Sequence, residues 1–440
     1  MMDTQPISPE RAGRLVEARL DRLPQDMLEA AVVLEAWAGV PAARALDAGR
    51  DLMAAHTPPR EKSAGAVPAA PAREGFAAEA VSFVLAVVAI ACWAAPLARE
   101  LGTDVLRTGL LVALPLTLAL QWGLRSRYLG RKDGMAHLGR HGRVLAVLPV
   151  VLVAGLTAAL GEGGTVAALL TLTWTAGTVL IARRWSALYA GGVIAATGAM
   201  LAGVPALPVL AATAALATVA VVAALRVQAD DVLQPPGRAR RAVAAMLIGA
   251  GLGALLVADP SVDWTVGAVP ALALLPSTVA SFWGGYHLWK FQQVIPRALS
   301  GVPVAGPEAR NPAWPGLRVL LGAVGRLAAA TMVLSGLLMV VSDAFGSRTS
   351  GVSVLAAFGL VALVTLIVSL LESVGRAGWA VLSVAAALAG ELAVRMAGEQ
   401  PFPAAGLIAG ATLALAVALP GAVMLLGRPA RTLATALWIA

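Results

Sequence analysis

Charged residues are scarce in this chain. Asp, Glu, Lys and Arg make up 13% of the sequence, whereas a soluble domain carries about 25%. Hydrophobic residues make up 59%, and the mean hydropathy is +0.80. A chain of this composition has too few polar side chains to cover its surface in water. A soluble globular protein is therefore excluded, and we expect an integral membrane protein.

Cysteine is nearly absent, and several catalytic motifs are missing. The one cysteine, Cys92, lies in an apolar run, which excludes an intrachain disulfide and a cysteine-based metal site. His137 and His141 are one helical turn apart, but no carboxylate pattern completes a metal site around them. The sequence contains no GxxxxGK[ST], HExxH or GxSxG motif. We therefore expect no cofactor, no bound metal, no ATP-driven step and no enzymatic activity.

Long apolar runs fill the sequence from Phe76 onward, after a polar and charged N-terminal region without the pattern of a signal peptide. A membrane-spanning helix needs about 20 apolar residues. The runs predict an all-α, polytopic membrane protein with about twelve transmembrane helices. The predicted spans are 79–98, 106–124, 144–161, 164–182, 186–204, 207–225, 242–258, 265–287, 319–341, 351–371, 377–397 and 403–426.

The basic residues alternate between loops. With the N-terminus inside, the predicted cytoplasmic loops and flanks hold 22 Arg and Lys, and the external loops hold four: Arg99, Arg107, Arg348 and Arg395. Basic loops stay on the cytoplasmic side, so we expect a bacterial inner-membrane protein with both termini in the cytoplasm. The net charge of +8 then faces anionic lipid, and no nucleic-acid partner is expected.

The chain divides into a polar N-terminal part and an apolar remainder. Ser8, Pro9 and Glu10 are typical of a helix start, and apolar residues recur after them at helical spacing. The predicted divisions are a cytoplasmic helical module (1–56), a Pro/Ala-rich linker (57–75), two halves of six helices (76–226 and 242–427) and a cytoplasmic tail (428–440).

An aromatic segment closes the predicted eighth span and contains Trp283, Tyr286 and His287. Pro270 and Pro276 lie earlier in the same span, and proline-interrupted helices often line a transport path. These side chains could therefore contact a polar substrate. Aromatic residues also gather at the membrane interface of ordinary helices, and this second interpretation stays open.

Two charged residues, Arg326 and Glu391, fall well inside predicted spans and away from their ends, and a charge costs at least about 2.5 kcal/mol at the bilayer centre. Arg326 could serve the substrate path or extend its side chain back to the cytoplasm. Glu391 could pair with Arg395, one turn away, or face a cavity and bind a proton or a substrate group. The predicted depths of Arg326 and Glu391 argue against a direct pair between them.

Two smaller patterns concern the helices themselves. Thr171, Thr175 and Thr178 share one face of the predicted fourth span, with Thr173 and Trp174 nearby. Hydroxyls on this face could line a polar path or bond to their own backbone. Gly249 and Gly253 form a small-xxx-small pair, which indicates close helix packing.

Two resemblances to transporter families follow. The segment from Gly123 to Lys132 is similar to the loop signature of the major facilitator superfamily in its Gly–Gly spacing and trailing basic residues, but Arg127 stands where that family has an aspartate. The plan of residues 79–426 resembles the multidrug/oligosaccharidyl-lipid/polysaccharide exporter superfamily, including lipid-linked sugar flippases and Pel-type polysaccharide export proteins. The resemblance is architectural and transfers no functional residue.

These observations predict a transporter or flippase, acting by alternating access on a polysaccharide or a lipid-linked envelope precursor. Its candidate path residues are Glu391, Arg326, Tyr286, His287, Trp283, Thr171 and Thr175. The alternative is a membrane scaffold that does not transport and recruits envelope-biosynthesis proteins through the N-terminal module.

Overall fold

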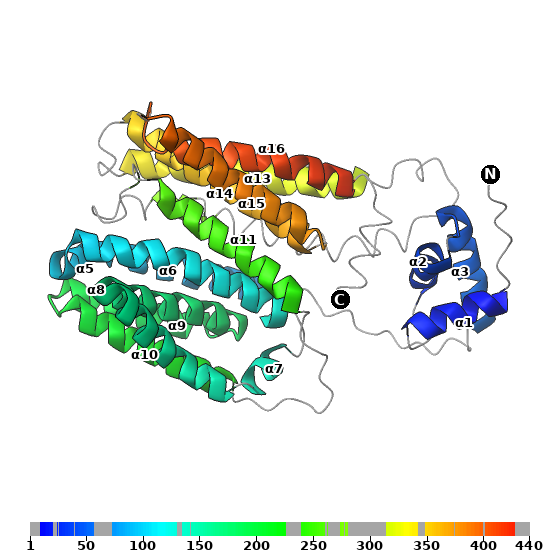
Figure 1. The fold of residues 1–440 in the computed structure, drawn as a ribbon, viewed down its shortest axis with the longest axis horizontal. Coiled ribbons are helices and arrows are strands. Elements are labelled where there is room, and N and C mark those ends of the chain that lie inside the picture. Colours follow the sequence, from blue (N-terminus) through cyan, green and yellow to red (C-terminus); the bar gives the residue numbers. More distant parts are fainter. Residues whose placement is uncertain are drawn as a thin grey trace. The chain divides into compact units, whose positions relative to one another are not determined.

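The computed structural model describes 16 helical elements in two compact units, α1–α3 and α4–α16. Each described element is a helix, and each unit is treated by itself below (Figure 1). The described residues are 9–20, 24, 26–38, 40–56, 73–129, 134–140, 142–225, 239–259, 262, 273–276, 278–279, 314–341, 348–373, 375–398 and 401–426.

The first unit is a three-helix module made of α1 (Pro9–Leu20), α2 (Met27–Ala38) and α3 (Ala42–His56). These helices lie within residues 1–56, which the sequence predicted to be a helical module, and α1 begins at the predicted helix start. Asp26 begins α2, because its carboxylate accepts a hydrogen bond of 2.8 Å from the Glu29 N–H. Val16, Leu34 and Leu52, one from each helix, are buried together. The module therefore has a small hydrophobic core of its own.

The second unit contains the apolar helices. They are α4 (Arg73–Ala91), α5 (Ala94–Leu101), α6 (Thr103–Leu124), the π-helix η1 (Arg125–Leu129), α7 (Gly134–Arg140), α8 (Gly142–Ala182), α9 (Ser186–Leu201), α10 (Ala206–Leu225), α11 (Ala239–Ala258), α13 (Trp314–Val341), α14 (Arg348–Ser373), α15 (Ala377–Met396) and α16 (Ala405–Leu426).

Nine helices among the described residues are long and apolar enough to cross a membrane. The chain is therefore a multi-pass helical membrane protein. The predicted count of about twelve is not reached in the described part of the chain, for three reasons. Helix α8 contains two of the predicted spans, α9 has 16 residues where span 186–204 was expected, and most of span 265–287 lies outside the described residues.

Helix α8 reverses direction at Gly161. That residue has φ 61° and ψ −136°, a conformation that glycine adopts without steric cost. The hydroxyl oxygens of Thr157 and Thr165 are 2.8 Å apart, although eight residues of straight helix would separate them by about 12 Å. The two arms of α8 therefore form a helical hairpin, at the position where the sequence predicted two separate spans.

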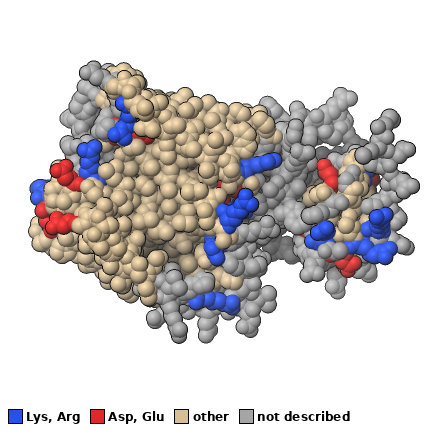
Figure 2. Space-filling view, in the orientation of Figure 1, with Lys and Arg blue, Asp and Glu red and all other residues tan. Residues whose placement is uncertain are grey.

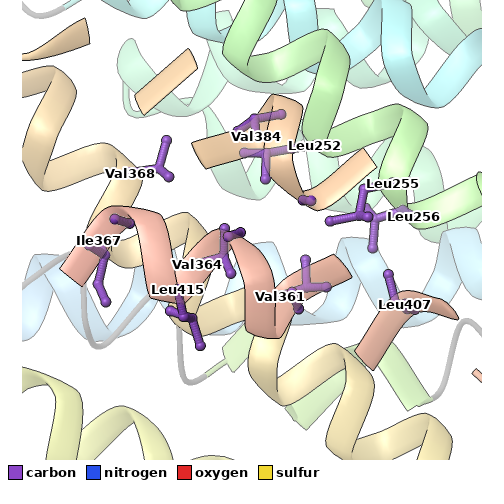
Figure 3. Packing of buried hydrophobic residues seen from close by; sticks show 14 of the residues in the cluster. Leu252, Leu255, Leu256, Val361, Val364, Ile367, Val368, Val384, Leu407 and Leu415 are labelled. Carbon is purple, nitrogen blue, oxygen red and sulfur yellow. The ribbon is translucent and has the colours of Figure 1, made fainter. Parts of the chain in front are cut away.

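Two large hydrophobic clusters lie within the described part of the second unit, beside two smaller ones. One packs α4, α5 and α6 against α8, α9 and α10 around Trp93, Leu106 and Leu170. The other joins α11, α14, α15 and α16. Its buried residues include Leu252, Val364 and Leu415, which are labelled in Figure 3. Helix α11 lies between the two sets of helices, beside α6 (Figure 1). Two six-helix halves remain a prediction, since the described cores do not establish them.

Gly249 and Gly253 allow the close contact between α11 and α6. A Cβ atom at Gly249 would lie 2.2 Å from the carbonyl oxygen of Leu118, and one at Gly253 would lie 2.5 Å from the Cα of Pro115. Any larger side chain would therefore push the two backbones apart. The packing role expected of this glycine pair is confirmed.

Most described charged side chains of the second unit lie near its two ends, although Arg326 lies within α13 and Glu391 within α15. Figure 2 shows them gathered towards its two ends, with a broad band of other residues between. Large apolar side chains are exposed along this band, among them Leu111, Val150 and Val219. An exposed apolar belt between two charged rims is the surface that a lipid bilayer covers.

An ion pair joins three elements at one of these ends. The Arg241 guanidinium lies 3.4 Å from the Glu372 carboxylate, and Glu372 also accepts a hydrogen bond of 3.2 Å from the Ser126 hydroxyl. Ser126 belongs to the π-helix η1, which directly extends α6. The segment from Gly123 to Lys132, which resembles a transporter loop signature, therefore begins as a helix that continues α6. This helical part packs against α11.

Candidate functional site: a cavity beside α6

A cavity of about 320 Å³ lies among α4, α5, α6, α8 and α9. Its longest wall is one stripe of α6, where Leu106, Leu110, Leu114, Thr117 and Gln121 recur at helical spacing. From Leu106 to Gln121 this stripe rises about 22 Å along the helix axis. The cavity is therefore elongated across the membrane-spanning part of the unit.

One end of the cavity is polar. Thr117 and Gln121 lie one turn apart on α6, and Trp174 and Thr178 lie one turn apart on α8. The Gln121 side-chain amide donates a hydrogen bond of 3.1 Å to the backbone carbonyl of Trp174, which holds the two pairs together. These side chains lie near the C-terminal ends of α6 and α8, beside the rim that carries Arg183.

Two polar groups at this end have no hydrogen-bond partner. The Thr117 hydroxyl and the Trp174 indole N–H are buried, and neither bonds to another group in the described structure. An unpaired polar group in an apolar setting costs about 1–3 kcal/mol. A hydroxyl-bearing or carbonyl-bearing ligand in the cavity would supply partners for both, because the hydroxyl can donate or accept and the indole donates.

Tyr189 completes the polar end from α9. Its side chain is 9% exposed, and its ring lies against the backbone of Gly177 on α8. A Cβ atom at Gly177 would lie 2.7 Å from the ring carbon that carries the hydroxyl and 2.9 Å from the hydroxyl oxygen itself. Only glycine at this position lets the phenol ring lie flat on α8.

The opposite end of the cavity is apolar. Leu97 on α5 and Leu106 and Leu110 on α6 line it near the α5–α6 junction. Trp93 stands in the adjoining wall, with its indole N–H already bonded at 2.8 Å to the Thr197 hydroxyl. No described residue that lines the cavity is charged. The cavity can therefore hold a neutral molecule with one polar end and one apolar end.

The predicted candidates Thr171 and Thr175 lie on α8 next to this cavity, but the described lining does not include them. Thr171 is fully buried, and neither hydroxyl makes a hydrogen bond within the described chain. The expected bonds to their own backbone are therefore not made, whereas Thr173 between them does donate to the Leu169 carbonyl at 2.9 Å. The polar side chains of α8 that line the cavity are those of Trp174 and Thr178.

Glu391 lies away from the cavity, on α15, and is 1% exposed. The expected pair with Arg395 is not formed, because neither Glu391 oxygen has a hydrogen-bond partner among the described groups. The exposed Arg395 guanidinium donates instead to the backbone carbonyl of Ala258 at 3.2 Å. Glu391 is thus a buried acid without the neutralising partner that the sequence suggested.

Arg326 lies on an exposed face of α13. One of its guanidinium nitrogens would be 3.1 Å from a Cβ atom at Gly322, so the side chain runs back along the helix towards its N-terminal end. This geometry is that of a side chain reaching for the membrane surface, and it separates Arg326 from the cavity. The remaining candidates, Trp283, Tyr286 and His287, lie outside the described residues.

Several residues of this region were not identified from the sequence. Thr117 and Gln121 are polar residues one turn apart within an apolar run, a signal that could have marked an inward face. Away from the cavity, Asp259 directly follows α11 and is 1% exposed, and its carboxylate accepts a hydrogen bond of 3.2 Å from the Leu407 N–H. It therefore caps the first turn of α16 from another segment.

Comparison with known proteins gives no relative. No protein-family model, no curated protein and no solved structure matches the chain. The site must therefore be interpreted from its own chemistry.

Proposed function

We propose that this protein is a membrane transporter that binds an uncharged amphiphile, such as a glycolipid, in the cavity beside α6 and moves it across the bilayer. The observation that carries the proposal is the pair of buried, unpartnered groups, Thr117 and Trp174, at one end of an otherwise apolar cavity. A substrate hydroxyl at that end and an acyl or isoprenoid chain at the other would match both environments.

The cavity also narrows the substrate class expected from the sequence. Burying an ionised group without a counter-charge is costly, and the described lining offers none. A free phosphate head group is therefore a poor occupant, whereas a sugar or glycerol hydroxyl is a good one. A lipid-linked envelope precursor fits this proposal when the part of it that enters the cavity carries no charge.

The test is a flipping measurement with the full chain in phospholipid vesicles. Glucosylceramide carrying an NBD fluorophore is placed in both leaflets, and dithionite is added to destroy only the outer-leaflet fluorescence. We expect the protein to accelerate the loss of the protected inner-leaflet signal for this uncharged lipid. NBD-labelled phosphatidylserine, which is anionic, should be moved much more slowly.

Two glycines of α8 provide a matched pair of variants. Gly177→Leu places a side chain where the Tyr189 ring lies, whereas Gly155→Leu adds the same side chain where no atom lies within 4 Å. Overpacking costs about 1–3 kcal/mol, so we expect Gly177→Leu to slow flipping about tenfold or more and Gly155→Leu to leave it unchanged. Thr117→Val, which preserves side-chain shape, should slow flipping without loss of folded protein. Equal rates for the wild type and these cavity variants would refute the proposal.

A further inference from the structure

Glu391 is the most unusual ionisable group in the second unit. It is 1% exposed, it lies within a membrane-spanning helix, and both its carboxylate oxygens lack a hydrogen-bond partner in the part of the chain that is described. A charged carboxylate in this setting would lose its hydration and gain nothing in return. The geometry therefore disfavours the ionised form.

Helix α16 crosses α15 at the residue before Glu391 and gives the carboxyl group no hydrogen-bond partner. The two helices cross at Gly390 and Gly410, where a Cβ atom at Gly390 would lie 3.1 Å from the Cα of Gly410. Between Ala405 and Leu426, α16 contains no charged residue. The crossing is tight and apolar, so it adds to the cost of a charge at Glu391.

Among the described side chains, the charged groups on the other neighbours do not compensate. Asp259, which follows α11, is close enough to Glu391 to repel a negative charge there, and its carboxylate is engaged by the Leu407 N–H. Arg395 attracts such a charge, but its guanidinium is exposed and is bonded to the Ala258 carbonyl. The described acid of α14, Glu372, lies near the opposite end of that helix.

We propose that Glu391 is a proton-binding site, whose carboxyl group holds a proton and is neutral at pH 7 in the state that the structure describes. Arg395, one turn nearer the C-terminal end of α15, is the group that could pair with the carboxylate after the proton leaves. One guanidinium nitrogen of Arg395 donates to the Ala258 carbonyl, and its other N–H groups could serve the carboxylate. The site would supply a coupling proton to a transporter, but its occupancy does not depend on the transport proposed above.

Infrared spectroscopy of the purified full chain at pH 7 tests this inference directly. A protonated carboxyl group and a carboxylate absorb at different carbonyl-stretch frequencies, and a solvated glutamate is ionised at this pH. Glu391→Gln should remove a protonated-carboxyl band from the wild-type spectrum. The matched control is Glu372→Gln, a second buried acid that is paired with Arg241 and should remove only carboxylate absorption.

The result that would overturn the inference is loss of carboxylate absorption, with no change in the protonated-carboxyl band, when Glu391 is replaced. If Glu391→Gln does not fold, Glu391→Asp keeps a carboxyl group and should shift the frequency of the same protonated band. An unshifted protonated band in Glu391→Asp would equally refute the proton site. None of these readouts requires flipping activity, so the site and the transport proposal can fail separately.

Discussion

At the residue scale, buried polar groups in this protein fall into two kinds. Asp259 is engaged, because its carboxylate accepts a hydrogen bond from the first turn of α16, a helix distant in sequence. Glu100, which is exposed, does the same for the first turn of α10. Such carboxylates satisfy free N–H groups and favour the positive end of the helix dipole. Thr117, Trp174 and Glu391 are buried without a partner in the described structure. The second kind carries both proposals made here.

The ion pair of Arg241 and Glu372 belongs to the first kind and gives a stability prediction. Glu372→Gln removes the negative charge beside Arg241, whose side chain is about a quarter exposed and still bonds to two backbone carbonyls. We expect a loss of about 1–3 kcal/mol in unfolding free energy, less than for a fully buried pair. Denaturant titration in mixed micelles measures it. Ser126→Ala, which leaves the pair intact, should cost less, and an equal cost would contradict this account.

At the element scale, the second unit is joined by glycine-mediated helix crossings. In lipid, apolar burial adds little to helix association, so close backbone approach and dispersion contacts carry more of the energy. Gly249 and Gly253 bring α11 onto α6, and Gly390 and Gly410 bring α15 onto α16. Helix α11 thereby connects the helices around the cavity with the helices around Glu391.

Substitution of one glycine at the α11–α6 crossing should separate these helices. In Gly253→Leu the new Cβ would lie 2.5–2.7 Å from backbone atoms of Leu114 and Pro115, which cannot rotate away. We expect a loss of at least about 3 kcal/mol or failure to accumulate in the membrane, the upper range for overpacking. Thermal unfolding followed by size-exclusion chromatography measures this. Gly191→Leu, with no atom within 4 Å, is the control and should behave as the wild type.

At the scale of the whole molecule, orientation in the membrane remains a prediction. It rests on 22 Arg and Lys in alternate loops against four in the others. Arg99 and Glu162, which the topology places outside, are exposed at helix ends or turns. Arg140 and Arg376, which it places inside, are exposed at helix ends as well. Charge at both rims fits a spanning unit without showing which rim faces the cytoplasm.

Thiol labelling determines the orientation once Cys92 has been replaced by alanine. Glu162→Cys, at the turn of the α8 hairpin, should react with an impermeant maleimide in intact spheroplasts. Arg140→Cys on α7 should react only after the membrane is permeabilised. We choose Glu162 because it is exposed, whereas the adjacent Gly163 is buried against Thr108. The opposite labelling pattern would reverse the orientation.

The sequence alone determined that this is a multi-pass helical membrane protein, where most of its described long helices lie, and that Gly249 and Gly253 form a packing face. These are local properties, because the length of an apolar run and the spacing of glycines decide them. Only the tertiary structure decided which side of each helix faces inward. Lipid and protein interior are almost equally apolar, so hydropathy does not distinguish a lipid-facing leucine from a cavity-lining one. For the same reason Thr117 and Gln121 were overlooked, Thr171 and Thr175 were preferred to their neighbours, and the expected Arg395 partner of Glu391 turned out to bind a carbonyl on another segment.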